Sequence, residues 1–357
     1  MKVDILQSLT SKVTGKIKAN KFIPLTQFIG VKVRDGKLLL CATDGSNSIC
    51  SKVGADISDD VNISVSSELF VKLVNALPPE MEVDISFSGN NLVISNNSID
   101  YHIPAISDDS GFIKYPEIDV PDNLASFDFK KFSDSYNQVQ NCVDAQSLYP
   151  YLSAVYVSDI MLGTNNRLLA KVDCGDLFNQ PVLLPLPLCE VMMQLEGDKI
   201  EFSVDNGYLT MRDDNTIIRG KLHDGLNEYP VDGIKGLFEQ SIDYFQKVNV
   251  DNLNSILDRI SLFISDFEDN IMNVDIKKDK LSILSISKSG YEELKCDGSE
   301  GDIVEQKIPI DVRLFSRMLK SFVTPSVEMT FLDKQVVAKK DNTQVICSFA
   351  AMGESNE

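Results

Sequence analysis

The sequence lacks the motifs on which most nucleotide and metal chemistry depends. It has no G-x-x-x-x-G-K-[ST] loop and no G-x-G-x-x-G motif that opens a helix. It has only two histidines, His102 and His223, and neither lies beside a cysteine or serine in a nucleophile motif. We expect both histidines to be surface or interface residues. The sequence therefore predicts a protein that is not an enzyme and needs no cofactor and no metal.

Long apolar runs and paired cysteines are also missing. No stretch approaches the roughly 20 apolar residues that a membrane-spanning helix needs, and the amphipathic start has no apolar core of a secretory signal. We therefore expect a soluble intracellular protein. No two cysteines have C-x-x-C spacing, which favours buried, reduced thiols over a disulfide framework or a zinc site. The seven cysteines are Cys41, Cys50, Cys142, Cys174, Cys189, Cys296 and Cys347.

Apolar residues recur every three or four positions in six segments, and each segment predicts a helix that packs on one face. The six are residues 4–18, 66–77, 128–143, 186–196, 251–264 and 311–322. In the first, Ile5, Leu9, Val13 and Ile17 recur at every fourth position. The odd helices start at 4, 128 and 251 and the even ones at 66, 186 and 311. This spacing predicts three structural repeats of about 120 residues each.

The segments between the helices predict antiparallel strands. Residues 31–33 and 37–42 flank an Asp35-Gly36 turn, and 200–204 and 208–212 flank Asn206-Gly207. Similar pairs are residues 83–87 with 92–95, 272–276 with 281–285, and 327–331 with 336–340. We therefore expect an α+β fold of three domains, each with two helices packed on antiparallel sheets. The expected domains are 1–120, 121–236 and 237–357, with linkers at 115–123 and 232–236.

The net charge of −19 argues by itself against nucleic-acid binding, because phosphates repel acid. The charge is not evenly spread, however. The six predicted helices hold ten Lys or Arg and nine Asp or Glu, whereas the other 277 residues hold 24 and 44. A ring that lines its hole with helices needs this segregation, because inner cations contact phosphates without reading bases.

Several of the predicted helices have a basic side. Arg313 and Arg317 are four residues apart and Arg317 and Lys320 three apart, so these side chains share a helix face. Any one such run, taken singly, is more typical of a solvated helix face. The helix cations that become candidates for DNA contact are Lys12, Lys16, Lys18, Lys72, Lys130, Lys131, Arg313, Arg317 and Lys320.

Four stretches carry a resemblance to a known family. Residues 37–44 end in Thr-Asp, 65–78 form a second helix, 151–155 precede the Gly-Thr-containing segment 163–170, and 221–230 end in Glu-Tyr-Pro. In this order and spacing the chain resembles, over essentially its whole length, the β sliding clamp of bacterial and bacteriophage replicative DNA polymerases. Each motif alone is weak, but the threefold repeat supports the set.

The resemblance implies a homodimer in which each chain forms half of a closed ring around double-stranded DNA. It implies a sequence-independent sliding clamp that confers processivity on the replicative polymerase, with a clamp loader as a further partner and a cytoplasmic, nucleoid-associated location. It adds Lys21, Gln146 and Tyr151 as DNA contacts. It also places Leu262 and Phe263 at the dimer interface, although core packing at a helix end is an equally open interpretation of these two residues.

The resemblance further implies a groove that binds short peptides of partner proteins. One wall of this groove is expected to consist of Leu152, Thr164, Arg167, Leu168 and Leu169. The other wall is expected to consist of Val345, Ser348 and Met352. The family pattern Thr-Asp-Gly-His-Arg-Leu is replaced here at residues 164–169, and the family ending Met-Pro-Met-Arg is replaced by residues 349–353 and a short acidic tail. These departures fit a tuned partner set, as in a bacteriophage or otherwise divergent clamp, or neutral drift in a tolerant groove.

Two functions of other classes stay open. An acidic DNA mimic that inhibits a basic replication partner would carry acid on exposed helix faces, which the near-neutral helices oppose. A carbohydrate- or nucleotide-processing enzyme built from repeated α+β domains would need a cluster of catalytic residues, which the sequence does not show.

Overall fold

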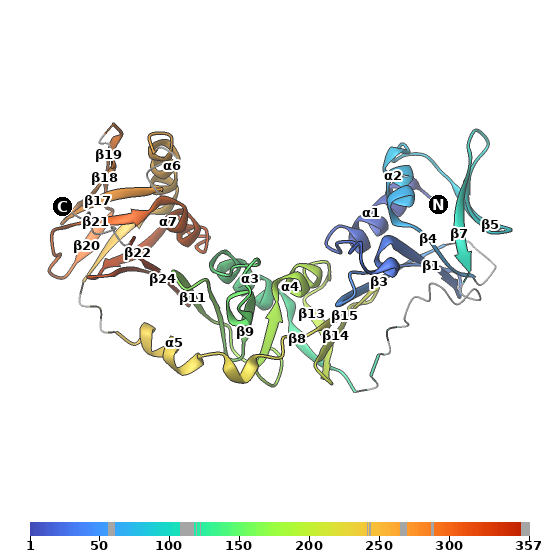
Figure 1. The fold of residues 1–357 in the computed structure, drawn as a ribbon, viewed down its shortest axis with the longest axis horizontal. Helices are drawn as coiled ribbons and strands as arrows, with labels where there is room; N and C mark the ends of the chain where they lie inside the picture. The colour runs from blue at the N-terminus through green and yellow to red at the C-terminus, as the bar shows by residue number, and fades with distance from the viewer. Residues whose placement is uncertain are drawn as a thin grey trace. The chain divides into compact units, whose positions relative to one another are not determined.

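The structure is a computed structural model that describes residues 1–55, 61–107, 118, 120–121, 123–240, 242, 244–264, 270–286 and 289–350. Its fold is α+β, and the named strands pair in antiparallel register, as expected from the sequence (Figure 1). The chain divides into two compact units, Met1–Lys130 with Pro187–Leu222 and Lys131–Leu186 with His223–Glu357. The three-domain division at residues 120 and 236 stays a prediction.

In its described residues, the first unit has an eleven-stranded sheet and two complete α-helices. Its elements are α1 (Val3–Thr14), η1 (Pro24–Gln27), β1 (Phe28–Arg34), β2 (Lys37–Thr43), β3 (Asn47–Gly54), β4 (Val61–Ser66), α2 (Ser67–Ala76), β5 (Asp84–Ser88), β6 (Asn91–Ser95), β7 (Asp100–Ser107), β8 (Ala125–Asp128), β13 (Lys199–Asp205), β14 (Tyr208–Arg212) and β15 (Thr216–Lys221). The strand order is β5-β6-β7-β4-β1-β2-β3-β15-β14-β13-β8. Helices α1 and α2 pack on each other and on β1 to β4, where the core of this unit lies.

In the part of the second unit that the structure describes, the strands form a nine-stranded and a four-stranded sheet. Its elements are η3 (Gln140–Cys142), η4 (Pro150–Leu152), β9 (Ala154–Val157), β10 (Ile160–Thr164), β11 (Leu168–Asp173), β12 (Val182–Pro185), η5 (Leu226–Glu228), α5 (Val231–Phe238), β16 (Phe245–Asn249), α6 (Val250–Ser261), β17 (Ile271–Lys277), β18 (Lys280–Ser285), β19 (Tyr291–Lys295), β20 (Gly298–Glu300), β21 (Gln306–Asp311), α7 (Val312–Leu319), β22 (Ser326–Phe331), β23 (Gln335–Lys340) and β24 (Thr343–Ser348). The strand orders are β12-β9-β10-β11-β24-β23-β22-β16-β20 and β19-β18-β17-β21. The remaining helices, α3 (Phe129–Val139) and α4 (Leu186–Met192), each cross a unit boundary.

In each long sheet, a strand from one predicted repeat pairs with a closing strand from another. In the first unit β3 pairs with β15, with Ile49 opposite Ile218. In the second unit β11 pairs with β24, with Leu169 opposite Ile346. Both pairings join segments far apart in the sequence, so each long sheet continues from one repeat into another.

The turns that lead into β3 and β11 have the same hydrogen bonds. Thr43 Oγ1 donates to the Asn47 carbonyl and Thr164 Oγ1 to the Leu168 carbonyl, both at 2.8 Å. Each threonine oxygen also accepts from the backbone N–H two residues later, at 3.1 Å in both turns. The Asp or Asn that follows each threonine accepts two further backbone N–H groups. This recurrence supports the repeat independently of helix spacing.

All six expected helices are present but shorter than predicted. Helix α1 ends at Thr14, so Lys16 and Lys18 lie beyond it. Its buried side is formed by Val3, Leu6, Leu9 and Val13, whereas Ile5 is exposed. The predicted stripe of every fourth residue was therefore wrong at its ends, because a helix of 3.6 residues per turn rotates such a stripe off the core.

The segment at residues 232–236, predicted as a linker, is helical. Helix α5 follows Pro230, which tolerates a helix start because its missing N–H would be unpaired there. Ile234 is buried in an apolar cluster with Tyr229 and Tyr156 of β9. The two glycines, Gly233 and Gly236, suggested a turn, but the apolar side of the helix packs on the nine-stranded sheet and outweighs their low helix propensity.

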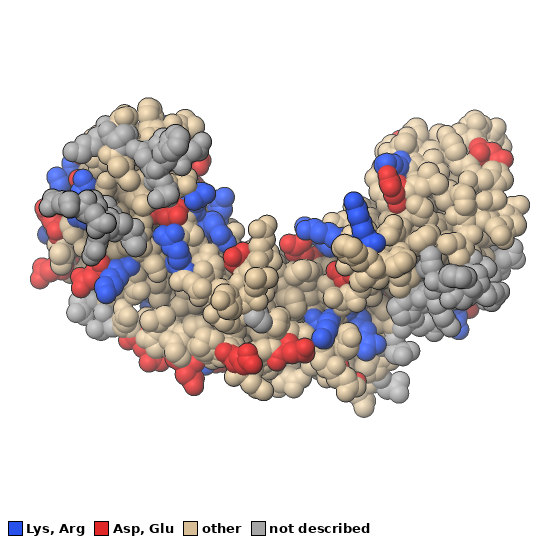
Figure 2. Space-filling view, in the orientation of Figure 1, with Lys and Arg blue, Asp and Glu red and all other residues tan. Residues whose placement is uncertain are grey.

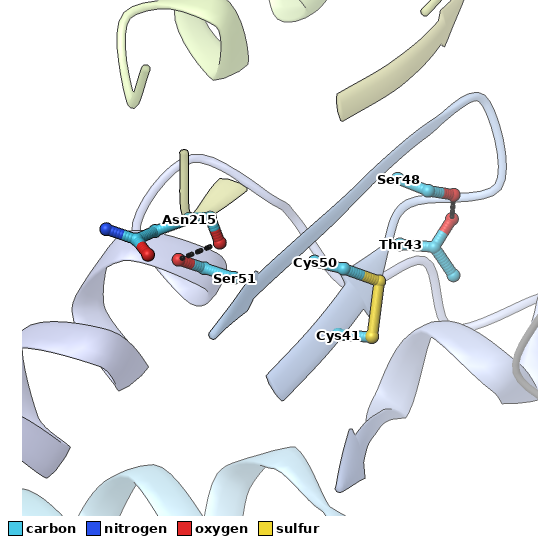
Figure 3. Close-up of a disulfide and its surroundings, with 6 residues drawn as sticks. All are labelled: Cys41, Thr43, Ser48, Cys50, Ser51 and Asn215. Atoms are coloured by element: carbon cyan, nitrogen blue, oxygen red, sulfur yellow. Dashed lines mark hydrogen bonds between the residues drawn. A yellow bond between two sulfur atoms is a disulfide. The ribbon is translucent and has the colours of Figure 1, made fainter. Parts of the chain in front are cut away.

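The expectation of seven reduced thiols was wrong for two of them. Cys41 of β2 and Cys50 of β3 face each other in the strand register with their Cα atoms 4.1 Å apart, and they form a disulfide (Figure 3). Sequence spacing alone did not reveal this pair because the strand register brings the two residues together. The other five cysteines are free and buried, as predicted, and burial raises the pKa of Cys142 to about 12.

Candidate nucleic-acid interface

The cations at the start of the chain do not all stand in the same environment. Lys12 of α1 forms an ion pair with Glu196 at 3.0 Å and lies 4.0 Å from Asp213, and its side chain is only 14% exposed. Lys16, Lys18 and Lys21, which follow the helix, are exposed. In the first unit Lys16, Lys18 and Lys21 are therefore accessible to a polyanion, whereas Lys12 is paired with carboxylates.

Helix α7 holds a second group of cations. Asp311 caps its first turn by accepting from the backbone N–H groups of Arg313 and Leu314. The Arg313 side chain is 68% exposed and Lys320 is exposed. Lys and Arg side chains gather over α7 in the space-filling view, whereas Asp and Glu gather over α5 (Figure 2). A cavity of about 270 Å³ with Arg313 and Lys320 in its lining lies between α6 and α7.

Arg317, on the same helix, has a structural partner. Its guanidinium donates to the carbonyls of Asn141 at 2.9 Å and Val143 at 3.1 Å. Buried carbonyls near a short helix end need such donors. Arg317 therefore fixes η3 against α7, and of the three predicted α7 cations it is the least available to a phosphate.

The other predicted DNA contacts lie on four separate elements. Lys72 is exposed on α2 and bonds Glu68 at 2.6 Å, which lowers the pKa of that carboxyl. Lys130 and Lys131 are exposed in the first turn of α3. Gln146 is exposed in the loop before η4, and Tyr151 is half-buried, with its ring 5.9 Å from that of Tyr149.

The residues predicted to form a peptide groove mostly lie in the sheet. Strand β11 brings Leu168 and Leu169 beside β24, which holds Val345. These three residues are buried, as are Leu152 and Thr164. Arg167 is exposed and Ser348 half-buried, and the Ser348 N–H donates to the Arg167 carbonyl at 2.8 Å. Met352 lies outside the described residues.

Sequence reasoning missed the partner of Arg167. The guanidinium Nη1 lies 3.3 Å from Oδ2 of Asp311, the residue that caps α7. Asp311 is buried and bonds Arg313 and Leu314 through its other oxygen. The motif Ile-Asp-Val at the start of a helix could have revealed the cap, but the pairing with a turn 144 residues away could not be read from spacing.

Sequence reasoning also missed that Tyr229 and helix α5 pack on the nine-stranded sheet. Tyr229 stacks on Tyr156 with ring centroids 5.2 Å apart, and Leu169 and Ile346 belong to the same cluster. Burial raises the pKa of Tyr229, whose hydroxyl has no hydrogen-bond partner. The aromatic residue of Glu-Tyr-Pro is therefore part of a core, which its place just before the predicted linker at 232–236 concealed.

Leu262 and Phe263 are exposed, at 81% and 51%. They follow the last turn of α6, which ends at Ser261. Core packing of both side chains, the alternative left open by the sequence, is therefore wrong. Ile286 and Tyr291 are also exposed, and Tyr291 begins the edge strand β19.

The histidines have local roles. His102 lies 3.2 Å from Asp100, and His223 accepts a bond from the Gly225 N–H at 3.1 Å. No group of three or more His, Cys, Asp or Glu among the described residues is placed to hold a metal ion. No helix within the same ranges is long and apolar enough to cross a membrane.

Comparisons with known proteins point to one family. The family model described as DNA polymerase III beta subunit, N-terminal domain, matches residues 2–117. A curated protein of Chlamydia trachomatis named Beta sliding clamp is 20% identical in an alignment of 279 positions that covers 73% of this chain and 64% of the relative's length. The alignment therefore spans less than two thirds of that relative.

Solved structures match the whole chain. The DNA polymerase III beta subunit of Pseudomonas aeruginosa is 15% identical with a TM-score of 0.82, over 99% of both chains. The beta subunit of Thermotoga maritima is 18% identical with a TM-score of 0.83, again over 99% of both chains. The sliding clamp of Bacillus subtilis is 17% identical with a TM-score of 0.83, over 99% of this chain and 98% of that one. The resemblance to β sliding clamps inferred from the sequence is confirmed, as is the fold.

Proposed function

We propose that this chain is a DNA sliding clamp that encircles duplex DNA and tethers a replicative DNA polymerase, which gives the polymerase its processivity. The observation that carries the proposal is the agreement of the two comparisons: the family model matches the first part of the chain, and the clamp fold extends over 99% of it. The alternative, an acidic DNA mimic, gains no support from either comparison.

Sequence-independent DNA contact is assigned in this proposal to exposed cations. Lys16, Lys18 and Lys21 in the first unit and Arg313 and Lys320 in the second are exposed. Phosphate contacts by such side chains contribute affinity without reading bases, which suits a protein that must move along DNA. Lys12 and Arg317 are expected to contribute less, because carboxylates and backbone carbonyls already bind them.

Partner binding is assigned to the end of the β10–β11 turn and the end of β24. Arg167 and Ser348 reach the surface there, and apolar Leu169 and Val345 lie in the strands behind them. Because these two apolar side chains are buried, Arg167 and Ser348 are the proposed contacts for a short linear peptide. We expect the polymerase and the clamp loader to contain such peptide segments.

Ring closure is assigned to a second copy of the chain. Leu262, Phe263, Ile286 and Tyr291 are exposed apolar residues of the second unit, and β19 leaves one strand edge of the four-stranded sheet unpaired within the described chain. Exposed apolar surface and an open strand edge both favour association. We infer that the chain forms a homodimer and that this dimer catalyses no reaction itself. We expect it to act in the cytoplasm, at the nucleoid.

Primer extension on a long single-stranded circle tests the proposal. The reaction contains the clamp loader and the polymerase of the same source. The polymerase is present in smaller amount than the primed template, so that each product reports one binding event. We expect the protein to lengthen products severalfold, and only when the loader and ATP are present. Product lengths that do not change, or that shorten as a DNA mimic would cause, would overturn it.

A further inference from the structure

The cysteines of the chain, all of which lie in its described part, differ in exposure. The five free cysteines are buried, and burial raises the pKa of each of their thiols. Buried thiols of this kind are chemically inert. In the disulfide, Cys41 is only 2% exposed, whereas Cys50 is half-buried. Cys50 is therefore the cysteine sulfur that a reagent in solution reaches most easily.

Two cavities of the first unit reach Cys50. One has a volume of about 620 Å³ with Cys50, Lys52 and Ile217 in its lining. The other has a volume of about 410 Å³ with Leu39, Cys41 and Cys50 in its lining. The share of liquid volume of one water molecule is about 30 Å³, so either cavity admits a small molecule. A small reagent can therefore approach Cys50 while the protein is folded.

The charged residues beside Cys50 on its face of the sheet are cations. The strand register places Cys50 between Cys41 of β2 and Ile217 of β15, and residues two places along each strand share this face. The charged residues at those places are Lys52 of β3 and Arg219 of β15, although the whole chain has a net charge of −19. Cations next to a cysteine stabilise its thiolate, which is the reactive form in thiol–disulfide exchange.

Hydrogen bonds hold β3 in the sheet independently of the disulfide. Ser51 Oγ lies 3.0 Å from Thr216 Oγ1, and both residues are buried. The Lys52 N–H donates to the Asn215 carbonyl at 2.9 Å. The disulfide can therefore open while β3 keeps its pairing with β15, so exchange at Cys50 does not require the unit to unfold.

We propose that Cys50 is a site of reversible thiol–disulfide exchange with small monothiols and that Cys41 is the buried thiol that leaves and returns. This inference goes beyond the proposed function and does not depend on it. The exchange makes the covalent link between β2 and β3 depend on the balance of thiols and disulfides around the protein. The stability that this link gives the first unit then depends on the same balance.

The exchange takes two steps, each with one bond formed and one broken. The thiolate of a monothiol attacks Cys50 Sγ, the Cys41–Cys50 bond breaks, and the electron pair leaves on Cys41 Sγ, which takes up a proton. A second thiolate attacks the small-molecule sulfur of the mixed disulfide, and Cys50 leaves as a thiolate and is protonated. Two monothiols are thereby oxidised to one small disulfide, and the protein pair is reduced. A small disulfide reverses both steps.

Mass spectrometry of the unreduced, unchanged protein tests the direction of attack. The protein is treated briefly with a limiting amount of 2-mercaptoethanol, the exchange is stopped with acid, and free thiols are labelled under denaturing conditions. Digestion then locates each label. We expect the mixed disulfide on Cys50 and a newly labelled thiol on Cys41, because exposure directs the attack. The five free cysteines are labelled with and without treatment and serve as the internal reference.

Two matched variants compare the two sulfurs as single thiols. Cys41→Ala leaves the Cys50 thiol beside the cavities, and Cys50→Ala leaves the Cys41 thiol in the sheet. Iodoacetamide, which is uncharged, should alkylate Cys50 about tenfold faster than Cys41, because both exposure and the neighbouring cations favour the Cys50 thiolate.

A further substitution separates the role of the cation from that of exposure. Lys52→Gln in the Cys41→Ala protein should slow alkylation of Cys50 about two- to fivefold at neutral pH and move the pH–rate profile to higher pH. Lys199→Gln is the matched control, because Lys199 lines the same cavity from β13, three strands away. A loss of packing alone would not move the pH–rate profile.

Three results would overturn the proposal. A mixed disulfide on Cys41, or on both cysteines equally, would show that exposure does not direct the attack. Exchange that occurs only in urea would show that the pair opens only in the unfolded chain. Seven free thiols in the unreduced protein would show that the pair does not form. None of these results depends on DNA binding, so each is distinct from a failure of the proposed function.

Discussion

The turn before β3 and the turn before β11 differ in side chains far more than in backbone. Both close with a threonine hydroxyl that bonds two backbone groups and an Asx residue that bonds two more. Where the first turn has Ser46, the second has Arg167, which pairs with Asp311. The backbone N–H of Lys221 donates to the Ser46 carbonyl at 3.1 Å, as Ser348 does to Arg167.

The residues that the two turns share maintain the junction between strands, whereas the residue that differs gives each turn its own surface chemistry. The buried threonines and the Asx residues satisfy backbone donors that would otherwise be unpaired, so they hold the junction between strands of different repeats. The exposed residue of each turn is free to change its chemistry. In the second unit this residue is Arg167, the one charged residue of the predicted peptide surface.

The largest expected difference between the two junctions comes from the disulfide, which only the first unit has among the described residues. Reduction of Cys41–Cys50 should lower the free energy of unfolding of the first unit by about 2–3 kcal/mol, because a short loop is no longer closed in the unfolded chain. Hydrogen exchange with and without reductant measures each unit separately. The second unit should show no change, and a Cys41→Ala/Cys50→Ala variant should not respond to reductant. Seven titratable thiols in the unreduced protein would instead support the reduced state expected from the sequence.

Removal of either threonine hydroxyl should have the next largest effect. Thr43→Val and Thr164→Val each leave a backbone N–H and a carbonyl without their partner, at a cost of about 1–3 kcal/mol. Urea unfolding measures the loss, and Thr→Ser at the same positions serves as the control that keeps the hydroxyl. If one variant is silent and the other is not, the two turns are not equivalent.

Asp311 should matter for one junction only. Asp311→Ala removes the cap of α7 and leaves Arg167 without its partner, which should cost about 1–2 kcal/mol. Asp311→Asn keeps an oxygen for the cap and loses only the charge, so it should cost less. Thermal unfolding of the two variants distinguishes the contributions, and equal losses would show that the cap is unimportant.

Arg167→Met should have the smallest effect on stability, below about 1 kcal/mol, because its side chain is nearly half exposed and solvent screens the pair. A double-mutant cycle with Asp311→Asn measures the coupling directly. A coupling of several kcal/mol would mean that Arg167 is part of the framework and not the specialised residue of its turn.

The sequence predicted features that depend on local pattern. Helical periodicity located six helices, and Asp35-Gly36 located a hairpin in which both residues have positive φ, as such turns require. The difference in net charge between the helices and the other segments follows from residue composition alone. These signals are local because each is set by residues within one turn or one hairpin.

The features that the sequence did not reveal depend on pairing between distant segments. The Cys41–Cys50 contact follows from strand register, the Arg167–Asp311 pair joins a turn to a helix start, and α5 is helical because it packs on a sheet. Helix ends were overestimated for the same reason, since the core determines which apolar residues are buried. Leu262 is an example, because its apolar side chain was equally compatible with a place in the core and with a place at an interface.

Retention on circular DNA tests the central claim most directly. The protein is loaded by its clamp loader onto a nicked circular plasmid, free protein is removed, and the plasmid is then cut once. A clamp that encircles DNA should remain on the circle and leave the linear form within minutes. Retention that is the same on circular and linear DNA would contradict the account.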